Sequence, residues 1–185
     1  TKDEMEVEYQ KMSRQNTDWF KILFRNSFNH NHSLSINGGS EKIQNRTSFG
    51  YSRQLGDAKG NNLSQFTVAS NTTVRLWEQL TVNMTVNGSM RKVDGFAYGV
   101  DPFWYAYNTS RVIPCYNEDG PLLYHEKSGR NSDAVQGKTT YNYNILNEQA
   151  HTGSENNTRT WGATFDLRWL LFGDLEYQGM FSYSS

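Results

Sequence analysis

The chain has 185 residues with a net charge of -1, and 36% of its residues are hydrophobic and 14% aromatic. The near-neutral charge gives no basic surface for nucleic acid, and so many aromatic residues argue against a disordered chain. No apolar run approaches the roughly 18 residues that a transmembrane helix needs, whereas transmembrane strands, which alternate, stay possible. A single cysteine, Cys115, excludes an internal disulfide framework and a cysteine zinc cluster.

The first segment, residues 1–29, is expected to be a lead-in loop with one short helix. Trp19, Ile22 and Leu23 have the spacing of one helical face, and polar residues that can cap a helix precede them. We therefore predict a helix over 17–25 that docks against a larger body.

From residue 30 the apolar period changes to two, which is the period of β-strands. The predicted strands are 31–37, 43–53, 66–76, 80–91, 157–171 and 175–185. The connections between them alternate between short turns, at 38–42, 77–79 and 172–174, and longer loops, at 54–64 and 93–156. Residues 93–156 show no sustained period, hold all three prolines, and are expected to form one long irregular loop.

Two architectures fit this alternation. In a soluble, secreted β-sandwich, the apolar faces of two sheets pack together and the polar faces meet water. In an outer-membrane barrel, the apolar face meets lipid and the polar face lines the interior. Long strands, alternating short and long connections, and aromatic residues near the strand ends favour the barrel. The soluble alternative would be a glycan-binding module.

The barrel hypothesis assigns side chains to two faces. The lipid-facing residues are predicted to be Phe49, Tyr51, Val82, Met84, Val86, Phe165, Leu167 and Trp169. The lumen-facing charged residues are predicted to be Arg46, Arg75, Arg91, Asp166 and Arg168, which can pair with a domain inside the barrel.

The order of short and long connections also sets strand direction. If the short turns are periplasmic, the strand at 31–37 descends toward the periplasm, whereas a barrel with periplasmic ends starts with an ascending strand. Six such strands would also leave two open edges, which lipid does not tolerate. We therefore expect residues 30–185 to be an internal part of a larger antiparallel barrel.

Several short blocks resemble one family, the SusC/RagA-type TonB-dependent transporters. The blocks are residues 16–20 (NTDWF), 29–42 (NHNHSLSINGGSEK), 48–51 (SFGY), 80–82 (LTV) and 116–120 (YNEDG). The resemblance covers nearly the whole chain and places the first three blocks at the start of the family's barrel.

This resemblance implies a plugged barrel of about 22 strands in the bacterial outer membrane. It implies import of oligosaccharides or peptides in Bacteroidetes-type bacteria, energy from the TonB complex, and a SusD-like surface lipoprotein as partner. The sequence shows no plug domain, TonB-box segment or C-terminal strand of that family. Coupling to TonB is therefore expected to use a part of the receptor outside this sequence.

An aromatic cluster in the long loop is the candidate contact site. The residues are Phe103, Trp104, Tyr105, Tyr107, Tyr116 and Asp119. Flat aromatic faces beside polar groups suit sugar rings or peptides, although such a loop can also fold on itself or dock the lipoprotein. His30 and His32 have no evident partner ligands, so no metal site is expected. No set of residues suggests a cofactor or a catalytic site, so enzymatic activity is not expected either. The sequence leaves the substrate undefined.

Overall fold

The computed structural model describes residues 2–130, 138–172 and 175–185, which separate into two compact units. We call Ser27–Leu55, Asn62–Asp94 and Glu155–Ser185 the sheet unit. The loop unit comprises Thr1–Asn26, Gly56–Asn61 and Gly95–Ser154. The sequence predicts a boundary near residue 29, between an N-terminal lead-in and the strands. In the structure, the N-terminal segment forms one unit together with Gly56–Asn61 and Gly95–Ser154.

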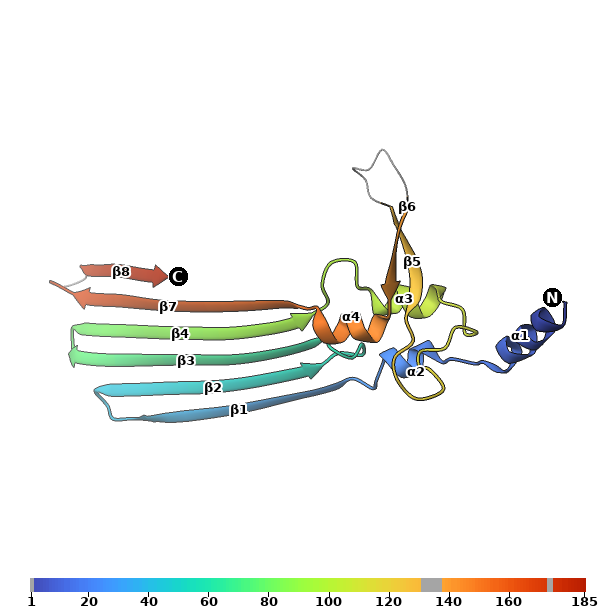
Figure 1. Cartoon of the computed structure of the whole chain (residues 1–185). Coiled ribbons are helices and arrows are strands. Elements are labelled where there is room, and N and C mark those ends of the chain that lie inside the picture. The colour runs from blue at the N-terminus through green and yellow to red at the C-terminus, as the bar shows by residue number, and fades with distance from the viewer. Residues whose placement is uncertain (1, 131–137, 173–174) are drawn as a thin grey trace. The chain divides into compact units, whose positions relative to one another are not determined.

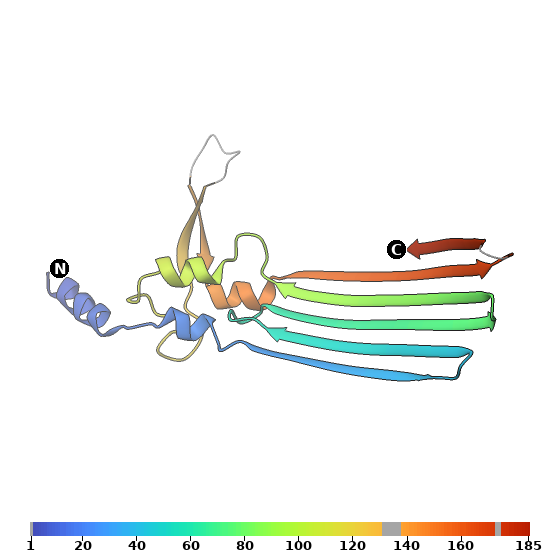
Figure 2. The same cartoon turned by 180° about the vertical axis from the view of Figure 1, so that it is seen from behind.

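The sheet unit is one six-stranded sheet with the order β1-β2-β3-β4-β7-β8. Its strands are β1 (Phe28–Gly39), β2 (Ile43–Leu55), β3 (Asn62–Trp77), β4 (Leu80–Gly95), β7 (Ser154–Leu170) and β8 (Glu176–Ser184). Neighbouring strands run in opposite directions, and the views from the front and from behind show the same order (Figures 1 and 2). All six predicted strands are therefore present.

The strands extend further than the alternation predicts, mainly at the end of the sheet opposite the short turns. β3 begins at Asn62 rather than at residue 66, and β4 ends at Gly95 rather than at residue 91. Main-chain hydrogen bonds continue there, as the pairing of Asn62 with Asp94 shows. We call this the loop end of the sheet and the opposite one the turn end. The predicted turn at 172–174 includes residues 173–174, which lie outside the described part of the chain.

Besides the predicted helix, α2, the loop unit contains regular structure that the sequence did not predict. Its elements are α1 (Lys2–Arg14), α2 (Trp19–Leu23), α3 (Pro102–Asn108), β5 (His125–Arg130), β6 (Lys138–Tyr143) and α4 (Ile145–His151). The expectation of an irregular loop over 93–156 is thus corrected to two helices and a hairpin. Each of these helices has 7 residues, which is too short for a helical period to show. No helix in the described ranges is long and apolar enough to cross a membrane.

Helix caps explain where the short helices begin. The Asp101 carboxylate accepts hydrogen bonds from the backbone N–H groups of Phe103 and Trp104, both at 2.9 Å. Pro102 follows at the first helical position, where a missing N–H costs nothing. Asp18 caps α2 in the same way, so this helix begins at Trp19 and is shorter than the predicted 17–25.

The core of the loop unit gathers side chains from α2, α3, β6 and α4. The buried members are Trp19, Leu23, Tyr105, Ala106, Cys115, Tyr143 and Ile145. Trp19 meets Tyr105 edge to face, with ring centroids 5.0 Å apart, and its indole N–H donates to the carbonyl of Ser110 at 3.2 Å. The prediction that Trp19 and Leu23 make α2 a docking helix is consistent with this packing.

Candidate functional site

The two faces of the sheet differ sharply in chemistry. Directly paired residues of neighbouring strands point to the same face, and Phe49 pairs with Val68, while Val74 pairs with Val82. The same face carries Leu34, Ile36, Ile43, Tyr51, Phe66, Met84, Val86 and Met90. We call it the apolar face.

The apolar face continues onto the last two strands. A Cβ atom on Gly88 would lie 2.4 Å from Cζ3 of Trp161, so β7 presents Trp161 beside the apolar side of β4. Phe165 then pairs with Phe181. All the residues predicted to face lipid lie on this one face: Phe49, Tyr51, Val82, Met84, Val86, Phe165, Leu167 and Trp169.

The opposite, polar face is built mainly from Asn, Gln, Ser and Thr. Thr73 donates to the side-chain carbonyl of Asn83 at 2.8 Å, which links β3 to β4 on this face. The residues predicted to face the lumen all lie here: Arg46, Arg75, Arg91, Asp166 and Arg168.

These five charged residues are not equivalent. Glu176 binds Arg168 through two contacts, 2.7 Å from Nε to Oε1 and 2.9 Å from Nη2 to Oε2. Such a two-point contact fixes the guanidinium within the sheet. The other four charged residues make no ion pair within the described ranges: Arg46, Arg75, Arg91 and Asp166. Their side chains are therefore free to form ion pairs with groups outside this chain.

Arg46 also lines a polar groove at the turn end. The groove has a volume of about 720 Å³, and its lining includes Asn37, Gln44, Asn71 and Thr73. Amide and hydroxyl groups line the groove together with the Glu41 carboxylate, so the groove suits a polar segment of protein better than an apolar one.

A polar cluster interrupts the apolar face, and the alternation of the sequence does not predict it. Asn45 donates to the hydroxyls of Thr72 at 2.8 Å and Ser70 at 3.3 Å. Thr47 donates to the side-chain oxygen of Asn45 at 3.0 Å and shares a hydrogen bond of 2.9 Å with Ser70. The four side chains therefore satisfy one another, which lowers the cost of placing them in an apolar environment.

In the loop unit, α3 divides the predicted contact residues between two sides. Phe103 and Tyr107 stack on each other with ring centroids 6.1 Å apart, and both lie edge to face with Phe20 of α2. Phe24, which is partly buried against the core, completes this group, which we call the aromatic patch. Trp104 is also exposed.

Tyr105 corrects the predicted contact set. Only 8% of this residue is exposed, because it points from α3 into the core against Trp19 and Tyr143. An aromatic-rich segment gives no sign, in sequence alone, of which rings face inward when the helix is only two turns long.

Tyr116 and Asp119 lie in a different part of the loop unit. They line a groove of about 610 Å³ together with Lys11 and Leu123. Asp119 belongs to a tight turn that Gly120 closes with a φ of 100°. The structure therefore groups the predicted contact residues into the aromatic patch, this groove and the core.

Burial keeps the titratable core groups neutral. It raises the pKa of the Cys115 thiol and that of Tyr105, and it raises the pKa of Tyr143 to about 12. A buried, protonated thiol is a poor nucleophile. The part of the chain that the structure describes holds no cluster of three potential metal ligands.

Comparisons with known proteins give the context for this sheet. No protein-family model matches the chain. It is 32% identical over 105 residues to the TonB-dependent receptor P26 of Formosa agariphila, covering 57% of the chain and 10% of that receptor. It is 29% identical over 131 residues to the TonB-dependent receptor SusC of Bacteroides thetaiotaomicron, covering 66% of the chain and 12% of that receptor.

A solved structure, that of the RagAB peptide transporter, matches 86% of the chain and 18% of the solved chain, with a TM-score of 0.56 and 19% identity. The chain thus spans about a tenth of the length of the two receptors. The predicted resemblance to SusC/RagA-type receptors is confirmed, as are the fold class, a segment of an antiparallel transmembrane barrel, and the outer-membrane location.

Proposed function

We propose that this chain forms part of the wall of a TonB-dependent importer, with the apolar face on lipid and the polar face on the lumen. The observation that carries the proposal is the separation of the two faces across all six strands. The resemblance to TonB-dependent receptors supports the same assignment.

The dimensions of the apolar face agree with a bilayer. Val82 and Met90 are eight residues apart on β4, which corresponds to about 27 Å along a strand. At a tilt of about 40°, this stretch covers about 20 Å, close to the apolar band of about 25 Å in such barrels. Trp161 and Trp169 have the same spacing on β7 and provide aromatic residues for both interfaces.

The edges of the sheet support further strands on both sides. β1 and β8 are the edge strands and each has one neighbour in the sheet. Hydrocarbon leaves unpaired N–H and C=O groups unsatisfied, so a sheet in lipid must close. We infer that the rest of a larger barrel pairs with these two strands.

The charged residues of the polar face are proposed contacts for a plug domain. Arg46, Arg75, Arg91 and Asp166 make no ion pair within the described chain, and Arg46 lies in a polar groove. A folded domain with carboxylates and amides would satisfy these groups inside the lumen. Coupling to the TonB complex would then involve the plug rather than this sheet.

The aromatic patch and the groove at Tyr116 are the proposed contacts of the loop unit. Phe103 and Tyr107 are exposed, and such rings can pack against a sugar ring, a peptide side chain or the apolar surface of a lipoprotein. The proposed cargo is an oligosaccharide or a peptide, and the proposed partner is a SusD-like lipoprotein.

The proposal is tested in a bacterium that carries the full-length receptor. The receptor should fractionate with the outer membrane, and its deletion should abolish growth on one oligosaccharide or peptide from a panel. Inactivation of TonB should cause the same loss. A receptor found in the soluble fraction, or uptake that does not depend on TonB, would contradict the proposal.

The soluble β-sandwich is the alternative, and it requires a second sheet over the apolar face. The described strands form the six-stranded sheet and one two-stranded hairpin, β5-β6, which is too small for that role. A chain that stays monomeric without detergent and unfolds cooperatively would nevertheless favour this alternative.

A further inference from the structure

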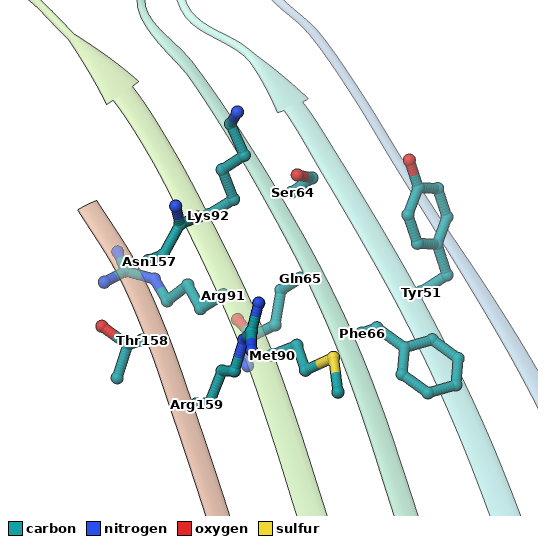
Figure 3. Close-up of a pocket in the computed structure, with 10 residues that line it drawn as sticks. All are labelled: Tyr51, Ser64, Gln65, Phe66, Met90, Arg91, Lys92, Asn157, Thr158 and Arg159. Atoms are coloured by element: carbon teal, nitrogen blue, oxygen red, sulfur yellow. The ribbon is translucent and has the colours of Figure 1, made fainter. Parts of the chain in front are cut away.

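A pocket lies at the loop end of the apolar face, where side-chain chemistry changes along the strands. It has a volume of about 220 Å³ and involves β2, β3, β4 and β7 (Figure 3). Along β7, the apolar face passes from Trp161 to Arg159, and along β4 it passes from Met90 to Lys92. The pocket therefore spans the boundary between an apolar surface and a cationic one.

The lining of this pocket is positively charged. Lys92 and Arg159, both on the apolar face, bring their charges to it, whereas Arg91, which also lines it, belongs to the polar face; no lining residue carries a carboxylate. Lys92 is held by Glu155, with 2.7 Å between Nζ and Oε2, and by Asp94 at 3.6 Å. Arg159 makes no ion pair within the described ranges, so its guanidinium is the cation available to a ligand.

The remaining lining residues divide into apolar and hydrogen-bonding groups. Phe66 pairs with Met90 across β3 and β4, and both side chains are 43% exposed. Tyr51, Ser64 and Asn157 add hydroxyl and amide groups at the border of this apolar floor. A ligand that fills the pocket thus needs an anionic head and an apolar tail.

We propose that this pocket binds a phosphate-bearing lipid, with the phosphate on Arg159 and an acyl chain along Phe66 and Met90. The inference rests on the proposed function, because it requires the apolar face to meet lipid. The fork of N–H donors on a guanidinium matches phosphate oxygens, and the apolar face below the pocket continues in the direction of the acyl chain. A free phosphate would leave Phe66 and Met90 uncovered, so the site belongs to the lipid headgroup.

The test uses the full-length receptor in detergent and lipid A as the probe, with its phosphates present or removed. Native mass spectrometry gives the affinity for each. We expect the phosphorylated lipid to bind more tightly, and Arg159→Gln to weaken its binding by about tenfold. Arg159→Lys keeps the charge without the fork and should give a smaller loss. The control, Lys42→Gln, removes a cation at the turn end of the sheet, between β1 and β2, and should bind like the wild type.

Four outcomes would overturn the inference. The first three are equal binding of the phosphorylated and dephosphorylated lipid, wild-type affinity in Arg159→Gln, and an equal loss in Lys42→Gln. Displacement of the lipid by millimolar inorganic phosphate would show a free-anion site and would also overturn it. A receptor absent from the outer membrane would instead contradict the proposed function, so the two failures are distinguishable.

Discussion

At the scale of single residues, Asn144 organises the loop unit. It is 2% exposed, and its amide donates to the carbonyls of Leu123 at 2.7 Å and Cys115 at 3.2 Å. Its side-chain oxygen accepts from the backbone N–H groups of Leu146 and Asn147, which caps α4. One side chain thus ties a helix start to two loop segments.

Asn144→Ala should therefore destabilise the loop unit by about 1–3 kcal/mol, because it removes a cap and the donor to the Leu123 carbonyl, while the Cys115 carbonyl keeps its bond from the Leu123 N–H. Hydrogen exchange at the amides of α4 in the full-length receptor measures this. Asn144→Asp keeps the cap and loses both donors, so its effect should be intermediate. Unchanged protection in Asn144→Ala would contradict the role given to this residue.

Tyr143 makes the loop unit sensitive to alkali. Burial raises the pKa of its phenol from 10.0 to about 12, so the folded state favours the neutral form more than the unfolded state does. This stabilisation is present in full below pH 10 and is lost as the pH rises through about 12. Hydrogen exchange across this range should show the loss, and Tyr143→Phe should reduce it. An equal alkaline loss in both proteins would contradict the assignment.

At the scale of elements, β4 shows best what alternation can predict. Its side chains were assigned to faces from a period of two, and the register confirms that Val82, Met84 and Val86 share one face. The ends of the strands were missed because polar residues occupy both faces there, while the hydrogen-bond ladder continues regardless. The short helices were missed because capping and long-range packing, rather than a repeated pattern, hold them.

A charge on the apolar side of β4 should destabilise the barrel. Met84→Arg is expected to cost about 2–4 kcal/mol if the side chain lies near the bilayer midplane. The matched control is Thr85→Arg, one residue along the same strand and on the polar face. Unfolding in urea from lipid vesicles compares the two, and equal stability of both variants would contradict the assignment of faces.

At the scale of the whole molecule, the sheet and the loop unit serve different parts of the proposed importer. The sheet provides a wall with one face for lipid and one for the lumen, and its edge strands, β1 and β8, need further partners. The loop unit has its own core and offers the aromatic patch as a binding surface. The period of two in the sequence predicts the sheet. It does not predict the fold of the loop unit, because that fold depends on contacts between segments far apart in the sequence.

The most direct test of the central claim is a spin-label scan along residues 81–87 of β4 in the full-length receptor, in a Cys115→Ala background and reconstituted in lipid. Even-numbered positions should be accessible to oxygen dissolved in the bilayer, and odd-numbered positions to a water-soluble nickel complex. A wall with these two faces gives a period of two in both signals, with opposite phase. Uniform accessibility, or the reverse phase, would contradict a membrane wall with these two faces.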